Sequence, residues 1–108
     1  NAGAVIGAEC YVGDNVFVNR LASVGHHCHI EEFASIGPGA HIASKVNIGR
    51  GTMIAAGVSI APGITVGSNC VIAVGSAVHK DVPSNTLIAG NPARIAKRNI
   101  AGHRGHSV

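Results

Sequence analysis

A strict six-residue repeat of aliphatic side chains constrains the fold of this chain more than any other feature. Every sixth residue from Ile6 to Val78 is Ile or Val, and no insertion breaks the spacing. The positions four residues further on, from Cys10 to Ser76, are all small or aliphatic. A helix of period 3.6 cannot keep these positions on one face, and a plain strand of period 2 gives no reason for six. The spacing therefore predicts a solenoid of short, stacked strands.

Three hexapeptides close one triangular coil of a parallel β-helix, so residues 6–77 predict about four full coils of eighteen residues. We predict an all-β fold, with this single-stranded β-helix over residues 1–81. An irregular C-terminal loop and basic tail, residues 82–108, are expected to pack on its end as part of the same domain. The β-branched residue of each hexad points inward, and the small residue fits the corner. Gly or Asn often follows the corner, where a positive φ costs little: Asn15, Gly39, Gly51, Gly57, Gly63, Asn69 and Gly75.

The composition excludes several other classes of protein. No apolar run reaches the roughly 18 residues of a membrane span, and no signal peptide is visible. Cys10, Cys28 and Cys70 lack metal-type CxxC spacing and fall on the small inward position, which predicts reduced core thiols in a cytoplasmic protein. The net charge of +3 is concentrated in residues 94–108, and only 3% of residues are aromatic, so we expect no nucleic-acid partner.

Residues eighteen apart stack in such a fold, and the three corners differ in chemistry. The columns read Ala8, His26, Ser44, Pro62 at the first corner; Asp14, Glu32, Arg50, Ser68 at the second; and Arg20, Pro38, Ala56, Val74 at the third. At the second corner, Glu32 and Arg50 are expected to form a weak, exposed ion pair. The first and third corners are mostly small or apolar, which is typical of an interface or a binding groove. We therefore predict a homotrimer with grooves where one subunit's first corner meets a neighbour's third.

Three of the chain's seven histidines fall within 26-HHCH-29. The repeat places His26 at a corner, His27 just after it, and His29 on a strand facing outward. We expect the three side chains to point in different directions, so a single three-histidine metal site is not expected.

Two motifs carry a family resemblance. The stretch 18–43 contains the form V-N-x-x-(A/S)-x-(V/I)-x-H-(D/E/H)-C-x-I-x-x-(F/Y), from Val18 to Phe33 and in register with the hexads, and the stretch 82–98 begins with V-P-x-N-x-(L/V)-x-x-G-N-P-A-(R/K). On these motifs the chain resembles the left-handed β-helix acyltransferases. In particular it resembles the bacterial sugar O-/N-acyltransferase family, which includes sialic acid O-acetyltransferases and nucleotide-sugar N-acetyltransferases. The left hand of the helix is implied by this resemblance.

The resemblance implies acetyl transfer from acetyl-CoA to a hydroxyl or amino group of a sugar or nucleotide-sugar. His26 is the implied general base in a direct transfer, without an acyl-enzyme and without a metal. Some family members have an acidic residue beside this histidine, whereas this chain has His27. Either another carboxylate orients His26, or the base is weaker. His27 and Asn19 are candidates for orienting the base or contacting the substrate.

The resemblance also places acetyl-CoA along the groove, parallel to the helix axis. The matching cofactor-binding positions are Ser35, Ser44, Ala56 and Val74, with Arg94 and Lys97 available for the phosphates. Full-length members usually carry an N-terminal α/β domain that binds the nucleotide part of the substrate, and nothing of it is seen in this sequence. Two alternatives stay open, a non-catalytic trimeric β-helix scaffold and a β-helix acetyltransferase for a non-sugar small molecule.

Overall fold

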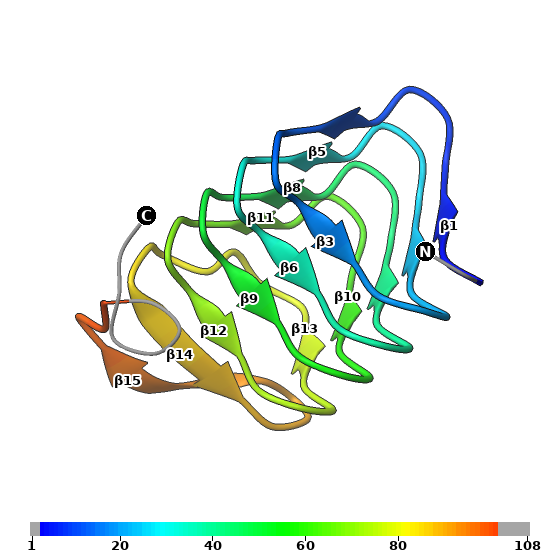
Figure 1. The fold of residues 1–108 in the computed structure, drawn as a ribbon. Coiled ribbons are helices and arrows are strands. Elements are labelled where there is room, and N and C mark those ends of the chain that lie inside the picture. Colours follow the sequence, from blue (N-terminus) through cyan, green and yellow to red (C-terminus); the bar gives the residue numbers. More distant parts are fainter. Residues whose placement is uncertain (1–2, 102–108) are drawn as a thin grey trace.

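The computed structural model describes residues 3–101, which form a triangular, left-handed parallel β-helix (Figure 1). Thirteen strands of two residues recur every six residues, and two longer strands follow. The short strands are β1 (Val5–Ile6), β2 (Tyr11–Val12), β3 (Phe17–Val18), β4 (Ser23–Val24), β5 (His29–Ile30), β6 (Ser35–Ile36), β7 (His41–Ile42), β8 (Asn47–Ile48), β9 (Met53–Ile54), β10 (Ser59–Ile60), β11 (Thr65–Val66), β12 (Val71–Ile72) and β13 (Ala77–Val78). The longer strands are β14 (Thr86–Ala89) and β15 (Arg94–Arg98).

Each short strand pairs in parallel with the strand three further along the chain, so paired residues are eighteen apart, as in Val24 with Ile42. Three sheets result, in the orders β1-β4-β7-β10-β13, β11-β8-β5-β2 and β15-β14-β12-β9-β6-β3. The predicted all-β solenoid is therefore confirmed. No helix within residues 3–101 is long and apolar enough to cross a membrane.

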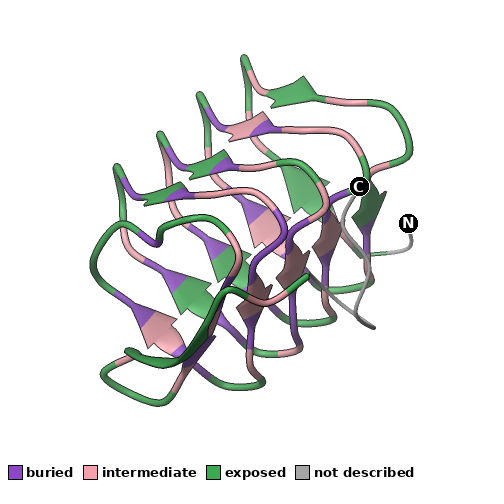
Figure 2. Cartoon of the chain, turned by 90° about the vertical axis from the view of Figure 1, so that its left-hand side faces the viewer, coloured by how far each residue is buried: buried purple, intermediate pink, exposed green. Residues whose placement is uncertain are grey.

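The core is a stack of the inward Ile and Val side chains predicted from the repeat. Ile30, Ile36, Ile42 and the equivalent residues of later coils are almost completely buried. The first coil differs, because it has a neighbouring coil on one side only within the described residues. Its inward residues Ile6 and Val12 are 44% and 39% exposed, and Figure 2 shows this coil as exposed while the strands of later coils carry the buried positions.

The place just after each corner has a positive φ throughout the helix, as predicted for its Asn and Gly residues. The same conformation also holds residues that disfavour it, including Leu21 (φ 61°) and Phe33 (φ 62°). An L-residue there costs about 1–2 kcal/mol. The coil imposes the conformation, because backbone N–H groups at these places donate to carbonyls of the coil beneath, as Phe33 does to Asp14.

The solenoid has about five turns, where the repeat predicted about four. Val82 pairs with Val66, and Ile88 of β14 pairs with Ile72, each sixteen residues away instead of eighteen. The chain takes four residues from Val78 to Val82 and then returns to six, so the period is interrupted once and resumes. Part of the segment that we predicted to be irregular therefore completes a fifth turn. β15 then pairs antiparallel with β14, and the basic tail beyond residue 101 lies outside the described residues.

The positions of the cysteines and the ion pair at the second corner are as the sequence predicted. Cys28 and Cys70 are buried free thiols, and Cys10 in the first coil is half-buried. Burial raises the pKa of the Cys28 and Cys70 thiols above its ordinary value, which suits core packing. At the second corner, Arg50 Nη1 lies 3.2 Å from Glu32 Oε1, so the predicted exposed ion pair is confirmed.

Candidate active site

His26 and His27 meet at the first corner, between β4 and β5, and a carboxylate joins them from the coil beneath. The Nδ1 atoms of the two rings lie 2.8 Å apart, within hydrogen-bond distance. The other nitrogen of His27, Nε2, lies 2.9 Å from Glu9 Oε1. The side chains of His27 and Glu9 are 52% and 66% exposed in the single chain. The corner therefore carries an accessible, hydrogen-bonded group of one carboxylate and two imidazoles.

This geometry corrects one expectation and places a carboxylate next to one of the clustered histidines. We expected the clustered histidines to point in different directions, but the positive φ of His27 (58°) turns its ring toward that of His26. His29 does point elsewhere, because it pairs with Glu31 and stacks on Tyr11 at 4.5 Å between ring centroids. The carboxylate beside the histidines is Glu9 of the same chain. The sequence held the signal for it, since Glu9 stands eighteen residues before His27.

The coil above His26 brings Ser44 over the same corner. The Lys45 N–H donates to the His26 carbonyl at 3.0 Å, which fixes the stacking of the two corners. Gly25 allows this close approach, because a Cβ at that position would lie 2.6 Å from Ser44 Oγ. Ser44 is half-buried, and Pro62 follows it on the next coil. The corner column beyond His26, toward the C-terminus, therefore continues with the small side chains of Ser44 and Pro62.

A second group of the predicted residues lies at the third corner, between the sheet of β3 and the sheet of β4. Asn19, Ser35 and Ala56 line one groove together with Phe17 and Met53. The Asn19 side chain accepts a hydrogen bond from the Arg20 N–H at 2.8 Å, which holds it in place. Val74 of the same corner is 74% exposed. Within a single chain, this groove and His26 lie on different edges of the triangle.

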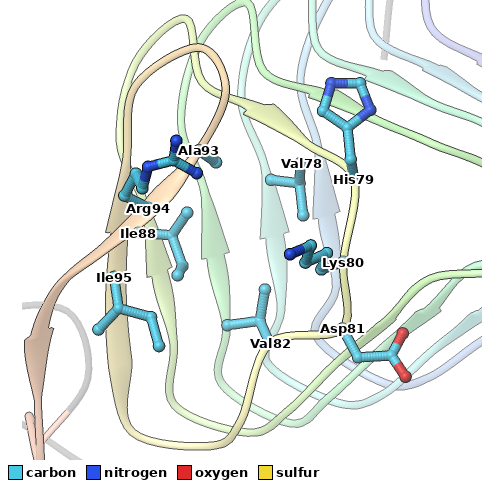
Figure 3. A pocket seen from close by; sticks show the side chains of 9 residues that line it. All are labelled: Val78, His79, Lys80, Asp81, Val82, Ile88, Ala93, Arg94 and Ile95. Carbon is cyan, nitrogen blue, oxygen red and sulfur yellow. The ribbon is translucent and has the colours of Figure 1, made fainter.

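A third group lies at the C-terminal end of the helix. Arg94 of β15 and Lys80, which follows β13, both line a pocket whose apolar residues include Val78, Val82 and Ile88 (Figure 3). Asp81 also lines this pocket, and its carboxylate, turned away from Arg94 in Figure 3, accepts a hydrogen bond from the Thr65 N–H at 2.8 Å.

Sequence reasoning missed Lys80, although the residue lies on the first-corner column three coils beyond His26. Lys97, the other predicted phosphate contact, is exposed on β15.

Among residues 3–101, no three His, Cys, Asp or Glu side chains are grouped as metal ligands would be.

Comparisons with known proteins agree with this architecture. The family model described as bacterial transferase hexapeptide, with six repeats, matches residues 9–44 and again residues 45–80. No curated protein sequence matches the chain. The acetyltransferase domain of PglB from Neisseria gonorrhoeae is 26% identical, with a TM-score of 0.75 over 86% of this chain and 54% of that one. A structure of that domain in complex with acetyl coenzyme A matches equally well.

Two further structures are similar. A maltose O-acetyltransferase from Clostridium difficile is 30% identical, with a TM-score of 0.74 over 88% of this chain and 66% of that one. A serine acetyltransferase from Neisseria gonorrhoeae is 28% identical, with a TM-score of 0.84 over 91% of this chain and 42% of that one. The chain thus spans about half the length of the structures it resembles. Because the family model covers two long blocks in register with the coils, the chain belongs to the bacterial transferase hexapeptide family.

Proposed function

We propose that this chain is an acetyltransferase domain that moves the acetyl group of acetyl-CoA to a hydroxyl or amino group of a sugar or nucleotide-sugar. The observation that carries the proposal is the position of His26, an exposed imidazole in a corner column whose neighbours Ala8, Ser44 and Pro62 have small side chains. Similar structures include acetyltransferases whose names specify maltose and serine as acceptors, and a PglB acetyltransferase domain with acetyl coenzyme A bound. A general base that projects from a corner of the helix can reach the reacting atoms of two substrates bound beside it.

The first corner also suits the shape and charge of the acetyl donor. Coils of parallel strands are spaced by about 4.8 Å, so Lys80 lies roughly 14 Å from His26 along the edge. A thioester at His26 would extend past the small side chains of Ser44 and Pro62. Lys80 and Arg94 at the C-terminal end would then meet the phosphates of CoA. Lys97 on β15 is a further cation near that end.

The chemistry requires one base and no covalent enzyme intermediate. His26 takes the proton of the acceptor hydroxyl or neutral amine on its Nε2 atom as the acceptor oxygen or nitrogen attacks the thioester carbonyl. The new bond to the acetyl carbon forms, and the bond from that carbon to sulfur breaks. The departing thiolate takes the proton back from His26 Nε2. The products are free CoA and the acetylated acceptor, with His26 returned to its neutral state.

A homotrimer would complete the site. The groove at the third corner holds Asn19, Ser35 and Ala56, with Val74 exposed beyond it. In one chain these residues are separated from His26 by a face of the triangle. Packing one subunit's first corner against a neighbour's third would place them on the two walls of a single groove. We propose that acetyl-CoA lies in this groove and that Asn19 contacts the acceptor.

Calorimetric titration of acetyl-CoA into the purified protein is the first test. We expect about one equivalent to bind per chain, and we expect Ser44→Trp to abolish binding because the indole would fill the edge above His26. Circular dichroism of Ser44→Trp controls for folding. Failure of the correctly folded wild-type protein to bind acetyl-CoA would contradict the proposal and favour a scaffold.

The second test separates catalysis from binding. His26→Ala should lower the rate of CoA release in the presence of an acceptor by about 100-fold or more, the typical contribution of a general base, while acetyl-CoA still binds. His41→Ala is the matched control, since His41 is an exposed histidine on β7 whose Nδ1 contacts Ser23. Full activity in His26→Ala would show that another group is the base. A panel of amino and hydroxy sugars, with serine added, identifies the acceptor class.

A further inference from the structure

Glu9, His27 and His26 form a continuous chain of polar contacts that the transfer as described above does not use. Glu9 Oε1 lies 2.9 Å from His27 Nε2, and His27 Nδ1 lies 2.8 Å from His26 Nδ1. We propose that Glu9 and His27 are positioning residues that fix the protonation pattern and orientation of His26. This Glu9–His27–His26 relay rests on the proposed function, in which His26 is the base.

The charge of Glu9 determines which nitrogen of each ring carries a proton. An ionised carboxylate only accepts hydrogen bonds, so His27 must carry its proton on Nε2, facing Glu9. In a neutral imidazole the other nitrogen is then an acceptor, which makes His27 Nδ1 a lone-pair atom. The proton between the two rings must therefore be on His26 Nδ1. His26 is left with its lone pair on Nε2, the atom that takes the acceptor's proton.

The relay also supplies a negative charge where positive charge develops. When His26 Nε2 takes a proton, the ring becomes a cation and its Nδ1–H continues to donate to His27. The carboxylate at the far end stabilises that cation through the polarised ring of His27. No proton needs to leave Glu9 or His27 at any point. The family resemblance associates this role with an acidic residue beside the base, and here that place is occupied by His27.

The stacking of the coils builds the relay. Glu9 and His27 occupy the same place in consecutive coils and share the same φ of 58°, so their side chains leave the corner in parallel. Lys45 occupies this place one coil further on, on the other side of His27 in the stack. Cys10 lies behind the corner, where its Sγ donates to the Gly25 carbonyl at 3.0 Å. The charged residues stacked around His27 are thus Glu9 beneath and Lys45 above.

The first experiment reads the protonation pattern directly and does not depend on activity. Long-range ¹H–¹⁵N NMR spectra at about pH 8, where ordinary histidines are neutral, distinguish a proton on Nδ1 from one on Nε2. We expect Nδ1–H for His26 and Nε2–H for His27 in the wild-type protein. Glu9→Ala should change both patterns. Glu31→Ala is the matched control, because it removes the carboxylate paired with His29 and should leave His26 and His27 unchanged.

The second experiment asks whether the relay acts in the transfer. Glu9→Ala should lower kcat about threefold to tenfold, in line with an exposed charge-assisted contact, and leave the KM for acetyl-CoA unchanged. His27→Asp places a carboxylate directly beside His26, so adding Glu9→Ala to that variant should cost nothing further. Glu31→Ala should retain wild-type kcat.

Two results would overturn the relay. One is a proton on His26 Nε2 in the wild-type protein, and the other is an equal loss of kcat from Glu9→Ala in the wild-type and His27→Asp backgrounds. An inactive wild-type protein that shows the expected protonation pattern would instead contradict the proposed function, while the hydrogen-bonded arrangement of Glu9, His27 and His26 would stand.

Discussion

At the scale of single residues, two kinds of glycine serve different purposes in the coil. Gly57 has a φ of +66°, and a Cβ there would meet nothing within 4 Å. Gly49 shows no left-handed φ, but a Cβ there would lie 2.4 Å from the carbonyl carbon of Gly67 on the next coil. The first glycine is favoured by the left-handed backbone conformation, which also holds Leu21 and Phe33 at equivalent places, and the second is required by the close approach of stacked coils.

These two roles predict different costs for the same substitution. Gly57→Ala should lower the free energy of unfolding by about 1 kcal/mol, the cost of a Cβ in the left-handed region. Gly49→Ala should lower it more, by about 2–3 kcal/mol, because the backbones of two coils must move apart. Urea unfolding followed by circular dichroism measures both. The close-approach argument would be contradicted if Gly49→Ala proved as stable as Gly57→Ala.

The buried thiols predict a loss of stability at alkaline pH. Burial raises the folded-state pKa of Cys28 and Cys70 above the ordinary value of 9.0. The unfolded chain therefore releases these protons first, so their contribution is fully present below about pH 9 and is lost as the pH rises beyond it. Urea unfolding at pH 7.5 and pH 9.5 should show this decline. The Cys28→Ala/Cys70→Ala double variant should decline less, and an identical decline would assign the effect to other groups.

At the scale of elements, the corner between β8 and β9 carries a buried hydroxyl that links two consecutive coils. Thr52 Oγ1 donates to the Gly67 carbonyl at 2.6 Å and accepts from the Cys70 N–H at 3.1 Å. Thr52 is completely buried, and it occupies the small inward position that most other hexads give to an aliphatic residue. A polar side chain is tolerated in this core because both of its hydrogen-bonding roles are satisfied.

The stability of the coils around Thr52 should therefore depend more on its hydroxyl group than on its methyl group. Thr52→Val keeps the shape but leaves the Cys70 N–H without its side-chain acceptor, which should cost about 1–3 kcal/mol of the free energy of unfolding. Thr52→Ser keeps the hydroxyl and should cost about 0.8 kcal/mol for the lost methyl group. Thermal and urea unfolding of the two variants, Thr52→Val and Thr52→Ser, measure the two costs. A Thr52→Val variant as stable as Thr52→Ser would show that the hydroxyl contributes little.

At the scale of the whole molecule, exposed apolar side chains lie on the edge that we predict to form subunit contacts. Phe17, which lines the third-corner groove, is 53% exposed in the single chain, and Val74 at the corner itself is 74% exposed. The second corner instead carries the exposed Glu32–Arg50 ion pair. This asymmetry favours a homotrimer in which the second corner stays in contact with solvent.

The molecular mass of the protein in solution tests the predicted homotrimer. Sedimentation equilibrium should give three times the 10.8 kDa of one chain. Val74→Glu should shift the mass toward that of a single chain, because it would bury three unpaired carboxylates at the contacts. Asp14→Lys at the second corner is the control and should remain trimeric. A wild-type protein with the mass of one chain would contradict both the trimer and a groove shared between subunits.

The sequence by itself determined the period, the inward side chains, the stacking of residues eighteen apart and the exposed position of His26. It could do so because each hexad obeys the same local rules, which makes the fold almost one-dimensional. Only the tertiary structure decided how the last turn closes, since the four-residue step to Val82 breaks the period. The meeting of the His26 and His27 rings was decided there as well, whereas the stacking of Glu9 beneath His27 follows from their spacing of eighteen residues. The contact between the two rings depends on the direction in which a positive φ points each side chain, and residue spacing does not encode that direction.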